Sequence, residues 1–327
     1  MATSTTHKFI KDLAAYEPID QVFQVVVKQQ RKKKVGTPYF HLELRDKTGK
    51  ISTNIWENLS QLESIPEHGF ARIKGQVDLY QGELQLKTSA ISLALENDIN
   101  PENFALYSAK DIEALFENLT QVLARIKDPF LMKLVEEFIK DKEFLERFKK
   151  SPAAVEKHQP YTGGLMEHTF NVATLALGVG AHYTTLNMDL LLTGIFLHDI
   201  GKIREYETKI TPQITDEGRL VGHTIFGILM LNEKISKIND FPTEYKTLLE
   251  HLIASHHGQL EYGAPVLPMT QEAIVLHYLD NLDARLGEYQ LLIQNAPKNS
   301  NTSAGSVQGR WTEWSKGLER KFYIPKV

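Results

Sequence analysis

The chain contains no cysteine, which excludes disulfide bonds and thiolate metal sites. This absence is typical of proteins from a reducing compartment. No stretch approaches the roughly 18 consecutive apolar residues that a membrane-spanning helix needs. Residues 1–11 are polar and lack the apolar region of a signal peptide. From these absences we expect a cytoplasmic protein without a membrane partner.

The charge of the chain is small but unevenly distributed. The net charge is −4 over 327 residues, so the whole-chain charge does not indicate a nucleic-acid partner. Residues 1–95 hold 13 Lys and Arg against 10 Asp and Glu, whereas the remainder holds 24 against 31. This asymmetry suggests a mildly basic module joined to an acidic one, and the length suits two domains.

The first 95 residues have the pattern of β-strands. A short helical segment is expected near residues 59–65, before the fourth strand. Turn residues at 46–49 and 80–83 indicate hairpins. The runs that are β-branched or alternate apolar and polar residues lie at 21–27, 39–45, 51–56, 70–77 and 84–91. Five strands in this order predict an OB-fold barrel, and the segment resembles OB-folds of the tRNA-anticodon-binding type.

From Ser108 onward the apolar residues recur with a helical period. Ser108 and Asp111 resemble a capping box that begins a first helix. Further helices are expected at about 129–149, 164–182, 187–199, 222–238, 243–256 and 270–295, the last with Thr270 as its N-cap. We therefore expect a multi-domain α+β protein: a five-stranded OB-fold barrel at 1–95, a linker at 96–107 and an all-α domain at 108–296.

The remaining residues, 297–327, are expected to form a C-terminal tail. Residues 297–309 are polar and rich in Gly, Ser and Asn, which is typical of a mobile loop. Trp311 and Trp314 then predict a terminal segment that packs back onto the protein.

The strongest chemical signal is a set of histidines and aspartates. His198 and Asp199 are adjacent and end the apolar run at 190–197. A buried carboxylate is costly unless it is paired or binds a metal. Five further residues of these two types lie at wide intervals: His168, His223, His256, His257 and Asp280. Alone, each position is more readily explained as a cap or a packing residue, but the ordered set predicts a metal centre.

Imidazole and carboxylate ligands together suit borderline divalent metals such as Mn, Fe, Co, Ni or Zn. A carboxylate has two oxygens, so Asp199 could bridge two ions. Such a pair clamps a phosphodiester and lowers the pKa of bound water. Because phosphoryl transfer depends mainly on positioning and charge stabilisation, no nucleophile triad is required. We expect two divalent ions, with manganese as the first choice, and hydrolysis of a phosphate ester.

The order of these residues resembles that of the HD-domain metallophosphohydrolases. More specifically, residues 163–169, 197–202, 222–223, 255–263 and 272–284 resemble the YhaM family of bacterial 3′→5′ exoribonucleases. That family joins an N-terminal OB-fold to a C-terminal HD domain, and the resemblance covers nearly the whole chain. The stretch after His256 is more specific than the His-Asp pair, which occurs in many hydrolases.

The resemblance implies a role for each site residue. His168, His198, Asp199 and Asp280 would hold one ion, and Asp199 would bridge to a second ion held by His223 and His256. Lys202 would place a cation at the phosphate, although a surface salt bridge is the alternative. The catalytic candidates are Asp199, Lys202 and His257. His257 could be a metal ligand, a hydrogen-bond donor to the phosphate or a residue behind the ligands. His277 and Asp283 are expected to lie behind the ligands or on the surface.

A basic stretch at 28–34 lies between the first two expected strands and is followed by two aromatic residues. Basic loops beside aromatic rings suit single strands, through phosphate attraction and base stacking. The alternative is a solvated hairpin tip with ordinary core aromatics. The nucleic-acid-binding candidates are Arg31, Lys32, Lys33, Lys34, Tyr39 and Phe40.

Together these patterns predict a metal-dependent 3′→5′ exoribonuclease that releases nucleoside monophosphates from single-stranded RNA, and single-stranded DNA is a second candidate substrate. The polarity comes from the resemblance alone. Two alternatives stay open: an HD phosphohydrolase of nucleotides or cyclic dinucleotides, and a non-enzymatic single-strand-binding protein. The residues do not decide the native metal, RNA against DNA, or whether the chain forms a homo-oligomer.

Overall fold

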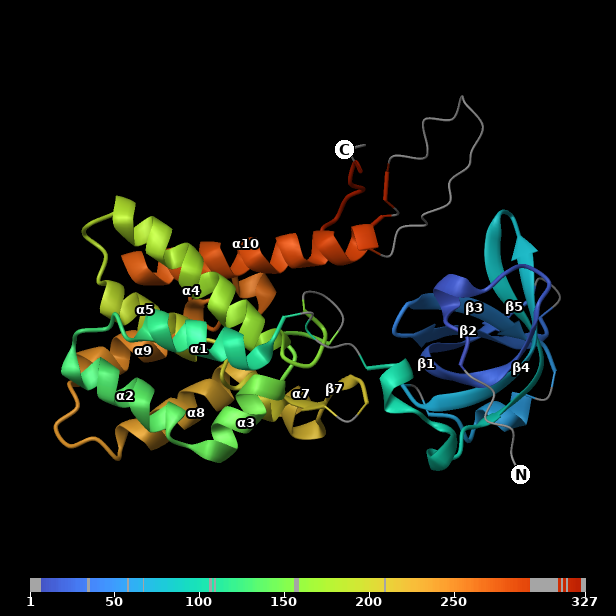
Figure 1. Ribbon diagram of the computed structural model, residues 1–327, viewed down its shortest axis with the longest axis horizontal. Helices are drawn as coiled ribbons and strands as arrows, with labels where there is room; N and C mark the ends of the chain where they lie inside the picture. Colours follow the sequence, from blue (N-terminus) through green and yellow to red (C-terminus); the bar gives the residue numbers. More distant parts are fainter. Residues whose placement is uncertain are drawn as a thin grey trace. The chain divides into compact units, whose positions relative to one another are not determined.

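The computed structural model divides the chain into two compact units, residues 1–106 and 107–327, and each is described by itself (Figure 1). None of the helices in the described part of the chain has the length and apolar character needed to cross a membrane. The residues that the structure describes are 7–33, 36–57, 59–66, 68–105, 108, 110–155, 159–208, 210–294, 311–312, 314–315 and 317–324.

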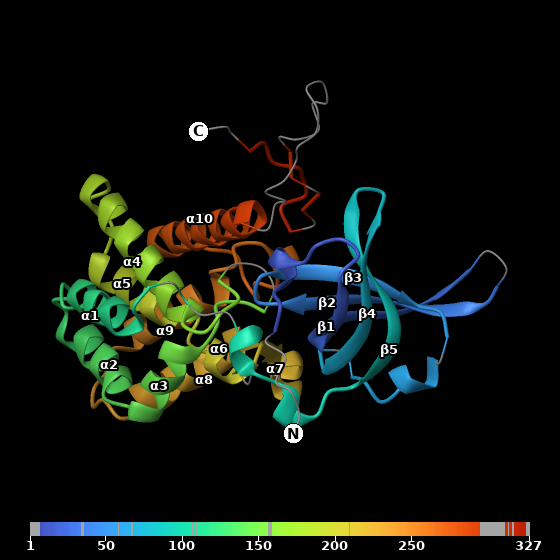
Figure 2. The same cartoon turned by 45° about the vertical axis from the view of Figure 1, so that its right-hand side comes forward.

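The first unit is a closed five-stranded barrel, seen at two angles in Figures 1 and 2. Its strands follow the order β1-β2-β3-β5-β4, and only the β3–β5 pairing is parallel. A 3-10 helix, Leu59–Leu62, lies between β3 and β4. This is the OB-fold topology, so the predicted barrel is confirmed. The strands are β1 (Pro18–Lys32), β2 (Pro38–Asp46), β3 (Gly49–Ile55), β4 (Phe70–Tyr80) and β5 (Glu83–Leu93).

The barrel forms because each strand sends alternate apolar side chains inward. In β2, Leu42 and Leu44 are fully buried, and Ile51 faces them from β3 at the register Leu44 to Ile51. Leu62 and Ile65, from the segment between β3 and β4, are fully buried members of the same core. Shorter 3-10 helices flank the strands at Ile10–Asp12, Glu96–Asp98 and Pro101–Asn103.

The second unit is helical and carries one small hairpin, β6 (Tyr206–Thr208) with β7 (Pro212–Ile214), which the sequence patterns did not predict. A 3-10 helix, Leu260–Tyr262, precedes the last helix. The helices are α1 (Ile112–Leu123), α2 (Pro129–Ile139), α3 (Lys142–Lys150), α4 (Gly164–His182), α5 (Met188–Leu197), α6 (Lys202–Glu205), α7 (Asp216–Val221), α8 (His223–Ile235), α9 (Thr243–Ser255) and α10 (Gln271–Gln294).

The first residues of three helices can be compared with the helix starts that the sequence predicts. The single helix expected at 129–149 is two helices, because Asp141 caps α3 by accepting from Phe144 N at 3.1 Å. The expected capping box at Ser108 is wrong, since Asp111 itself is the N-cap of α1. The Thr270 cap is confirmed by its hydroxyl, which accepts from Ala273 N at 3.2 Å.

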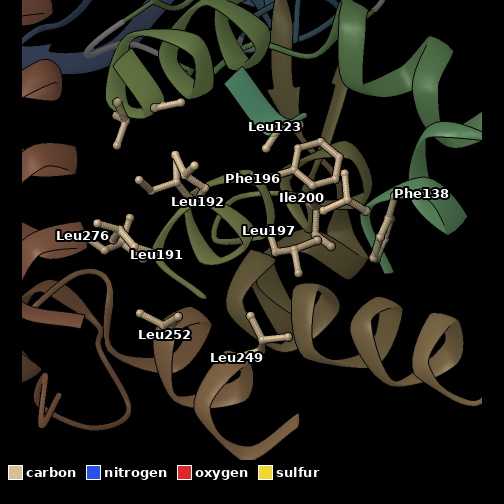
Figure 3. Packing of buried hydrophobic residues seen from close by; sticks show 14 of the residues in the cluster. Leu123, Phe138, Leu191, Leu192, Phe196, Leu197, Ile200, Leu249, Leu252 and Leu276 are labelled. Carbon is tan, nitrogen blue, oxygen red and sulfur yellow. The ribbon is translucent and has the colours of Figure 1, made fainter. Parts of the chain in front are cut away.

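Helix α5 is the centre of the helical core. Every residue from 190 to 197 is buried, as expected for a helix surrounded by others. Figure 3 shows Leu191, Phe196 and Leu197 packed among side chains that include Phe138 and Leu252. Burying each such side chain contributes about 1.5–3 kcal/mol. This packing fixes the C-terminal end of α5, where His198 and Asp199 follow.

The described part of the C-terminal tail packs against α10, as the sequence predicts. Ser315 Oγ donates to Glu288 Oε1 at 2.8 Å, and the rings of Phe322 and Tyr289 meet edge to face at 5.3 Å. Trp311 and Trp314 suggested this return, yet both remain about half exposed. The loop expected at 297–309 lies outside the described residues.

Candidate metal centre

The predicted histidines and aspartates converge inside the helical unit, although more than a hundred residues separate the first from the last. His198 and Asp199 follow the last residue of α5, and His256 and His257 follow the last residue of α9. The other three come from the second turn of α4, the first turn of α8 and the middle of α10: His168, His223 and Asp280.

Three of these residues form a first group. His168 Nε2 lies 3.1 Å from Asp280 Oδ1 and 3.3 Å from His198 Nε2. His168 and His198 are fully buried. One ligand atom from each residue lies within 4.8 Å of the other two, so the group could hold a metal ion.

His223, His256 and His257 form a second group with the same property. The Nε2 atoms of His223 and His257 are 3.0 Å apart. Burial, followed by the facing His223, lowers the pKa of His257 to about 4. His257 is therefore a neutral imidazole near pH 7, which is the form that can ligate a metal.

Asp199 lies between the two groups. Its Oδ2 is 3.3 Å from His198 Nε2 and 3.8 Å from His168 Nε2. Its Oδ1 is 3.6 Å from His256 Nε2 and 3.7 Å from His223 Nε2. Each carboxylate oxygen thus faces a different group, which is the geometry of a residue that can bridge two ions.

Two of the histidines are held from behind by carboxylates. His168 Nδ1 donates to Asp283 Oδ2 at 2.7 Å, and His223 Nδ1 donates to Glu205 Oε2 at 2.8 Å. The His223 hydrogen bond outweighs burial and lowers the pKa of Glu205, so this carboxylate is ionised. A proton fixed on Nδ1 leaves the Nε2 lone pair facing inward, an arrangement that metal-binding histidines commonly have.

Two further histidines are held by backbone carbonyls in matching ways. His198 Nδ1 donates to Ile195 O at 2.7 Å, and His256 Nδ1 donates to Ile253 O at 2.7 Å. Each acceptor lies three residues earlier, at the C-terminal end of a helix whose last carbonyls have no helical partner. The ends of α5 and α9 therefore fix the tautomer of one histidine in each group.

The donor set fits divalent metal ions. Among the described residues, Asp199 Oδ1 and His256 Nε2 are buried without any hydrogen-bond partner. Buried polar atoms are nearly always paired, so two orphaned acceptors that face one another need an explanation. A cation between the inward lone pairs would satisfy them, and nitrogen with carboxylate oxygen suits borderline divalent metals.

The charges of the first group agree with this interpretation. Burial alone would lower the pKa of His168, but hydrogen bonds to Asp280 and Asp283 raise it to about 10. Burial raises the pKa of Asp280, but the His168 hydrogen bond outweighs it, so the pKa lies far below its usual range. These opposite pKa shifts reflect the contact of 3.1 Å between His168 Nε2 and Asp280 Oδ1.

Lys202 lies against the carboxylate of Asp199, with its Nζ 2.6 Å from Asp199 Oδ2. Both side chains are almost completely buried. Burial would raise the pKa of Asp199, but Lys202 and then His198 hold it well below its usual range. This contact is a buried ion pair at the centre of the site, whereas the alternative drawn from the sequence was a surface salt bridge.

Two glycines allow the segments that carry these histidines to approach one another. A Cβ added to Gly201 would lie 1.9 Å from His223 O, so the turn after Asp199 can meet the start of α8 only without a side chain. Gly258 has φ +73°, and a Cβ there would lie 2.1 Å from the ring of His277. His277 itself donates through Nδ1 to His256 O at 2.9 Å.

Asp283 and Glu205 are the carboxylates that hold His168 and His223 from behind. Asp283, expected behind the ligands or on the surface, also accepts from Gln159 Nε2 and Asn171 Nδ2, both at 3.0 Å. Glu205 was not predicted. The only signal for it was its place shortly after the His-Asp pair, at the end of α6.

The nucleic-acid candidates lie at the β1–β2 end of the barrel. Arg31, Lys32 and Lys33 are exposed there, whereas Lys34 lies outside the described residues. Tyr39 was predicted, and its ring stacks on Trp56 at 4.4 Å and 28°. Phe40 packs against the barrel core, which agrees with the alternative of an ordinary core aromatic.

Trp56 is a surface aromatic that the sequence patterns missed. It is 46% exposed, and Lys33 Nζ lies 4.5 Å from the centre of its ring. The pairing of Phe40 with Ile55 brings the adjacent Tyr39 and Trp56 together. The β2–β3 register was the signal that could have found this pair.

A comparison with protein families places the HD domain in the helical unit. Residues 165–285 match the family model of the HD domain, and this range contains every residue of both histidine groups. Among solved structures, the second OB-fold domain of replication protein A from Methanococcus maripaludis matches 27% of this chain and 98% of its own. That match has 24% sequence identity and a TM-score of 0.22. The fold and the site thus define an HD-domain protein with an N-terminal OB-fold barrel.

Two curated relatives extend the likeness to almost the whole chain. The 3′-5′ exoribonuclease YhaM of Geobacillus sp. (strain WCH70) is 32% identical over 297 residues, which cover 89% of this chain and 86% of that protein. The 3′-5′ exoribonuclease YhaM of Bacillus velezensis is 30% identical over 312 residues, 94% of this chain and 95% of that protein. The chain belongs to the YhaM family.

Proposed function

We propose that this chain is a metal-dependent 3′→5′ exoribonuclease that hydrolyses single-stranded RNA to nucleoside monophosphates. One observation of the site carries the proposal: Asp199 directs one carboxylate oxygen at each of two histidine groups. Family membership supports the RNA substrate and the polarity, since the relatives carry the name 3′-5′ exoribonuclease.

The proposed ligands follow the two groups. His168, His198 and Asp280 would hold one ion, and His223 and His256 the other, with Asp199 shared between them. His257 belongs to the second group by its distances, so we propose it as a further ligand there. Two divalent ions, with manganese as our first choice, would supply Lewis acidity and lower the pKa of water.

The chain's own residues would prepare the site for a phosphodiester. Asp283 and Glu205 fix the tautomers of His168 and His223 through hydrogen bonds of 2.7 and 2.8 Å. Lys202 holds the orientation of Asp199 through its ion pair, and its positive charge favours the approach of an anionic phosphate.

We further propose that the barrel binds the single strand. Tyr39 and Trp56 offer a stacked aromatic surface, and Lys33 adds a cation above the exposed indole ring. Arg31 and Lys32 extend this positive charge along the end of β1. Exposed rings stack on bases of any sequence, and Lys and Arg side chains attract the phosphates, so the surface suits a single-stranded substrate.

A labelled single-stranded RNA tests the proposed function directly. With manganese present, a 5′-labelled strand should shorten gradually from its 3′ end, and a chelator should stop the reaction. A matched strand that ends in a stable 3′ hairpin should stall the enzyme at the duplex edge. Immediate internal fragments would indicate an endonuclease, and immediate release of the 5′ nucleotide would indicate the opposite polarity. Hydrolysis of free nucleotides alone would replace the proposal with the nucleotide hydrolase.

A further inference from the structure

A pocket of about 790 Å³ lies between α10 and the described residues of the C-terminal tail, and none of the residues of the two histidine groups lines it. We call those residues, 311–312, 314–315 and 317–324, the C-terminal hairpin. Figures 1 and 2 both show this segment in red beside the C-terminal part of α10. The pocket volume falls in the range of roughly 300–1,000 Å³ that small-molecule sites occupy.

The C-terminal hairpin is an ordered wall of this pocket. Thr312 N donates to Phe322 O at 2.8 Å, and Ser315 N donates to Arg320 O at 3.0 Å, so its two arms are paired. The Ser315 hydroxyl then attaches the hairpin to Glu288 of α10 at 2.8 Å. Both walls therefore have defined positions within the helical unit.

The charged groups of the pocket are all positive. None of the ten described residues that line it is acidic, and two of them are Arg285 and Arg320. Arg285 Nε donates to Asn281 Oδ1 at 2.8 Å, and Arg320 Nε donates to Leu318 O at 2.9 Å. Neither guanidinium forms an ion pair with a described Asp or Glu. Their remaining donors suit an anion, and the planar guanidinium matches phosphate oxygens well.

The pocket also offers aromatic faces. Tyr278 is 66% exposed and Tyr323 is 41% exposed, so part of each side chain is open to solvent. Tyr289 and Phe322 pack edge to face and connect the two walls. Guanidinium groups beside exposed rings recognise a phosphate joined to a flat base, because the cation binds the anion and the ring stacks on the base.

We propose that this pocket binds a nucleoside phosphate, either as part of an RNA strand or as a free nucleotide. Tyr278, Arg285 and Tyr289 are spaced at i, i+7 and i+11 on α10, so they share one face of that helix. Asp280 lies on a different face and belongs to the metal centre. The pocket is therefore a second nucleotide subsite, and α10 connects it to the candidate metal centre. The RNA-strand form of this proposal rests on the proposed function.

Binding to the full chain in the presence of a chelator tests this proposal without turnover. The probes are a 5′-fluorescein 12-nucleotide oligouridylate, read by fluorescence anisotropy, and radiolabelled AMP, read by equilibrium dialysis. The Arg285→Gln/Arg320→Gln double variant should bind at least one probe about 5- to 20-fold more weakly. For the oligonucleotide, the slope of log affinity against log salt should also fall by about one to two. If only AMP binding is lost, the natural ligand of the pocket is a free nucleotide. If oligonucleotide binding is lost, the ligand is part of an RNA strand.

The matched control is the Arg125→Gln/Arg147→Gln double variant, which removes the same charge from exposed positions of the helical unit. It should bind both probes as the wild type does. Tyr278→Ser removes an exposed ring without changing charge, so it should weaken binding while leaving the salt slope unchanged. Thermal unfolding of each variant checks that the fold survives.

Wild-type binding of both probes by the Arg285→Gln/Arg320→Gln variant would overturn the proposal. A change in its mass in solution, with unchanged affinity, would also overturn it and would identify the pocket as a contact for a second copy of the chain. The proposed function fails separately, if manganese-loaded wild type leaves single-stranded RNA intact while AMP binding is still lost in the variant.

Discussion

Two buried aspartates, one in each unit, show how a structural carboxylate differs from one suited to chemistry. Asp46 of the barrel is 3% exposed and Asp199 of the helical unit is 2% exposed. Asp46 accepts from Ile10 N, Thr48 N and Thr48 Oγ1 at 2.6 to 2.7 Å, so its oxygens are satisfied by neighbouring donors. Asp199 has one strong partner, Lys202, and an Oδ1 without any among the described residues.

The difference lies in what surrounds each carboxylate. Donors surround Asp46, and they fasten the N-terminal segment to the end of β2. Histidine nitrogens surround Asp199, and those of His198 and His256 face it as acceptors because their Nδ1 protons point away. Burial alone therefore does not mark a functional carboxylate. A buried carboxylate among inward-facing acceptors is the better candidate, because acceptors without a donor need a cation or a proton between them.

Asp199→Asn should have the largest effect on function. It removes the negative charge that would be shared by both ions, so metal content should fall for both sites. RNA cleavage should fall by more than the roughly 10–100-fold that follows loss of a residue behind the ligands. Elemental analysis and cleavage of labelled RNA measure the two effects.

The control for that change is Asp216→Asn, which alters an exposed aspartate at the start of α7. It should leave both metal content and cleavage unchanged. Full metal content in Asp199→Asn would remove the basis for a shared carboxylate.

Asp46→Asn should cost stability and leave metal binding intact. Hydrogen bonds to a charged group contribute about 1.5–3 kcal/mol each when lost, so a destabilisation of this order is expected at pH 7. Burial raises the pKa of Asp46, but hydrogen bonds from His7 and Thr48 outweigh it and hold the pKa below its ordinary value in the folded state. The stabilisation is therefore present above the unfolded pKa and is lost as the pH falls through the folded one.

Urea unfolding followed by tryptophan fluorescence measures this contribution. The difference in unfolding free energy between wild type and Asp46→Asn should be full at pH 7 and should shrink as the pH falls below about 4. A difference that stays constant over this range would show that the charge of Asp46 does not matter, and reduced metal content would contradict its purely structural role.

Substitution of the two carboxylates behind the histidines should affect the two proposed metal sites independently. Asp283→Ala should lower the affinity for the ion proposed at His168 by about 10–100-fold. Glu205→Ala should lower the affinity for the ion proposed at His223 by a similar factor. Titration calorimetry with manganese should resolve one weakened and one nearly unchanged site in each variant. Glu205→Gln should lie between wild type and alanine, because its amide oxygen can still accept from His223 Nδ1. Equal weakening of both ions in both variants would contradict two separable groups.

The sequence predicted the barrel and the set of histidines and aspartates that converge in the helical unit, because both have strong local signals. Alternation marks the strands of the barrel, and the apolar run at 190–197 marks the helix that carries Asp199 into the core. The break between α2 and α3 was missed because apolar residues continue across it, with Phe138 before it and Phe144 after it. Only the cap at Asp141 distinguishes two helices from one.

Contacts set by tertiary structure could not be predicted in this way. Glu205 has no periodic neighbours, and its bond to His223 exists because Gly201 lets two helices meet. Trp56 lies just beyond β3, and its stacking on Tyr39 depends on the β2–β3 register. The pocket at the C-terminal hairpin could not be predicted from the sequence either, because its two walls come from segments that are not adjacent in the chain.

The smallest effect is expected at the barrel surface, where Trp56→Ala removes one stacking ring. The cost should be about 1 kcal/mol, or roughly fivefold in affinity for single-stranded RNA, at the lower end for a lost base–aromatic stack. The salt dependence of binding should not change, because no charge is lost. Lys33→Gln should instead lower the salt slope by about one, since one phosphate contact disappears. Tyr183→Ala, at an exposed tyrosine of the helical unit, is the matched control and should bind normally. If Trp56→Ala binds RNA as the wild type does, the basic end of β1 and β2 is a solvated hairpin tip, and the barrel holds the strand elsewhere.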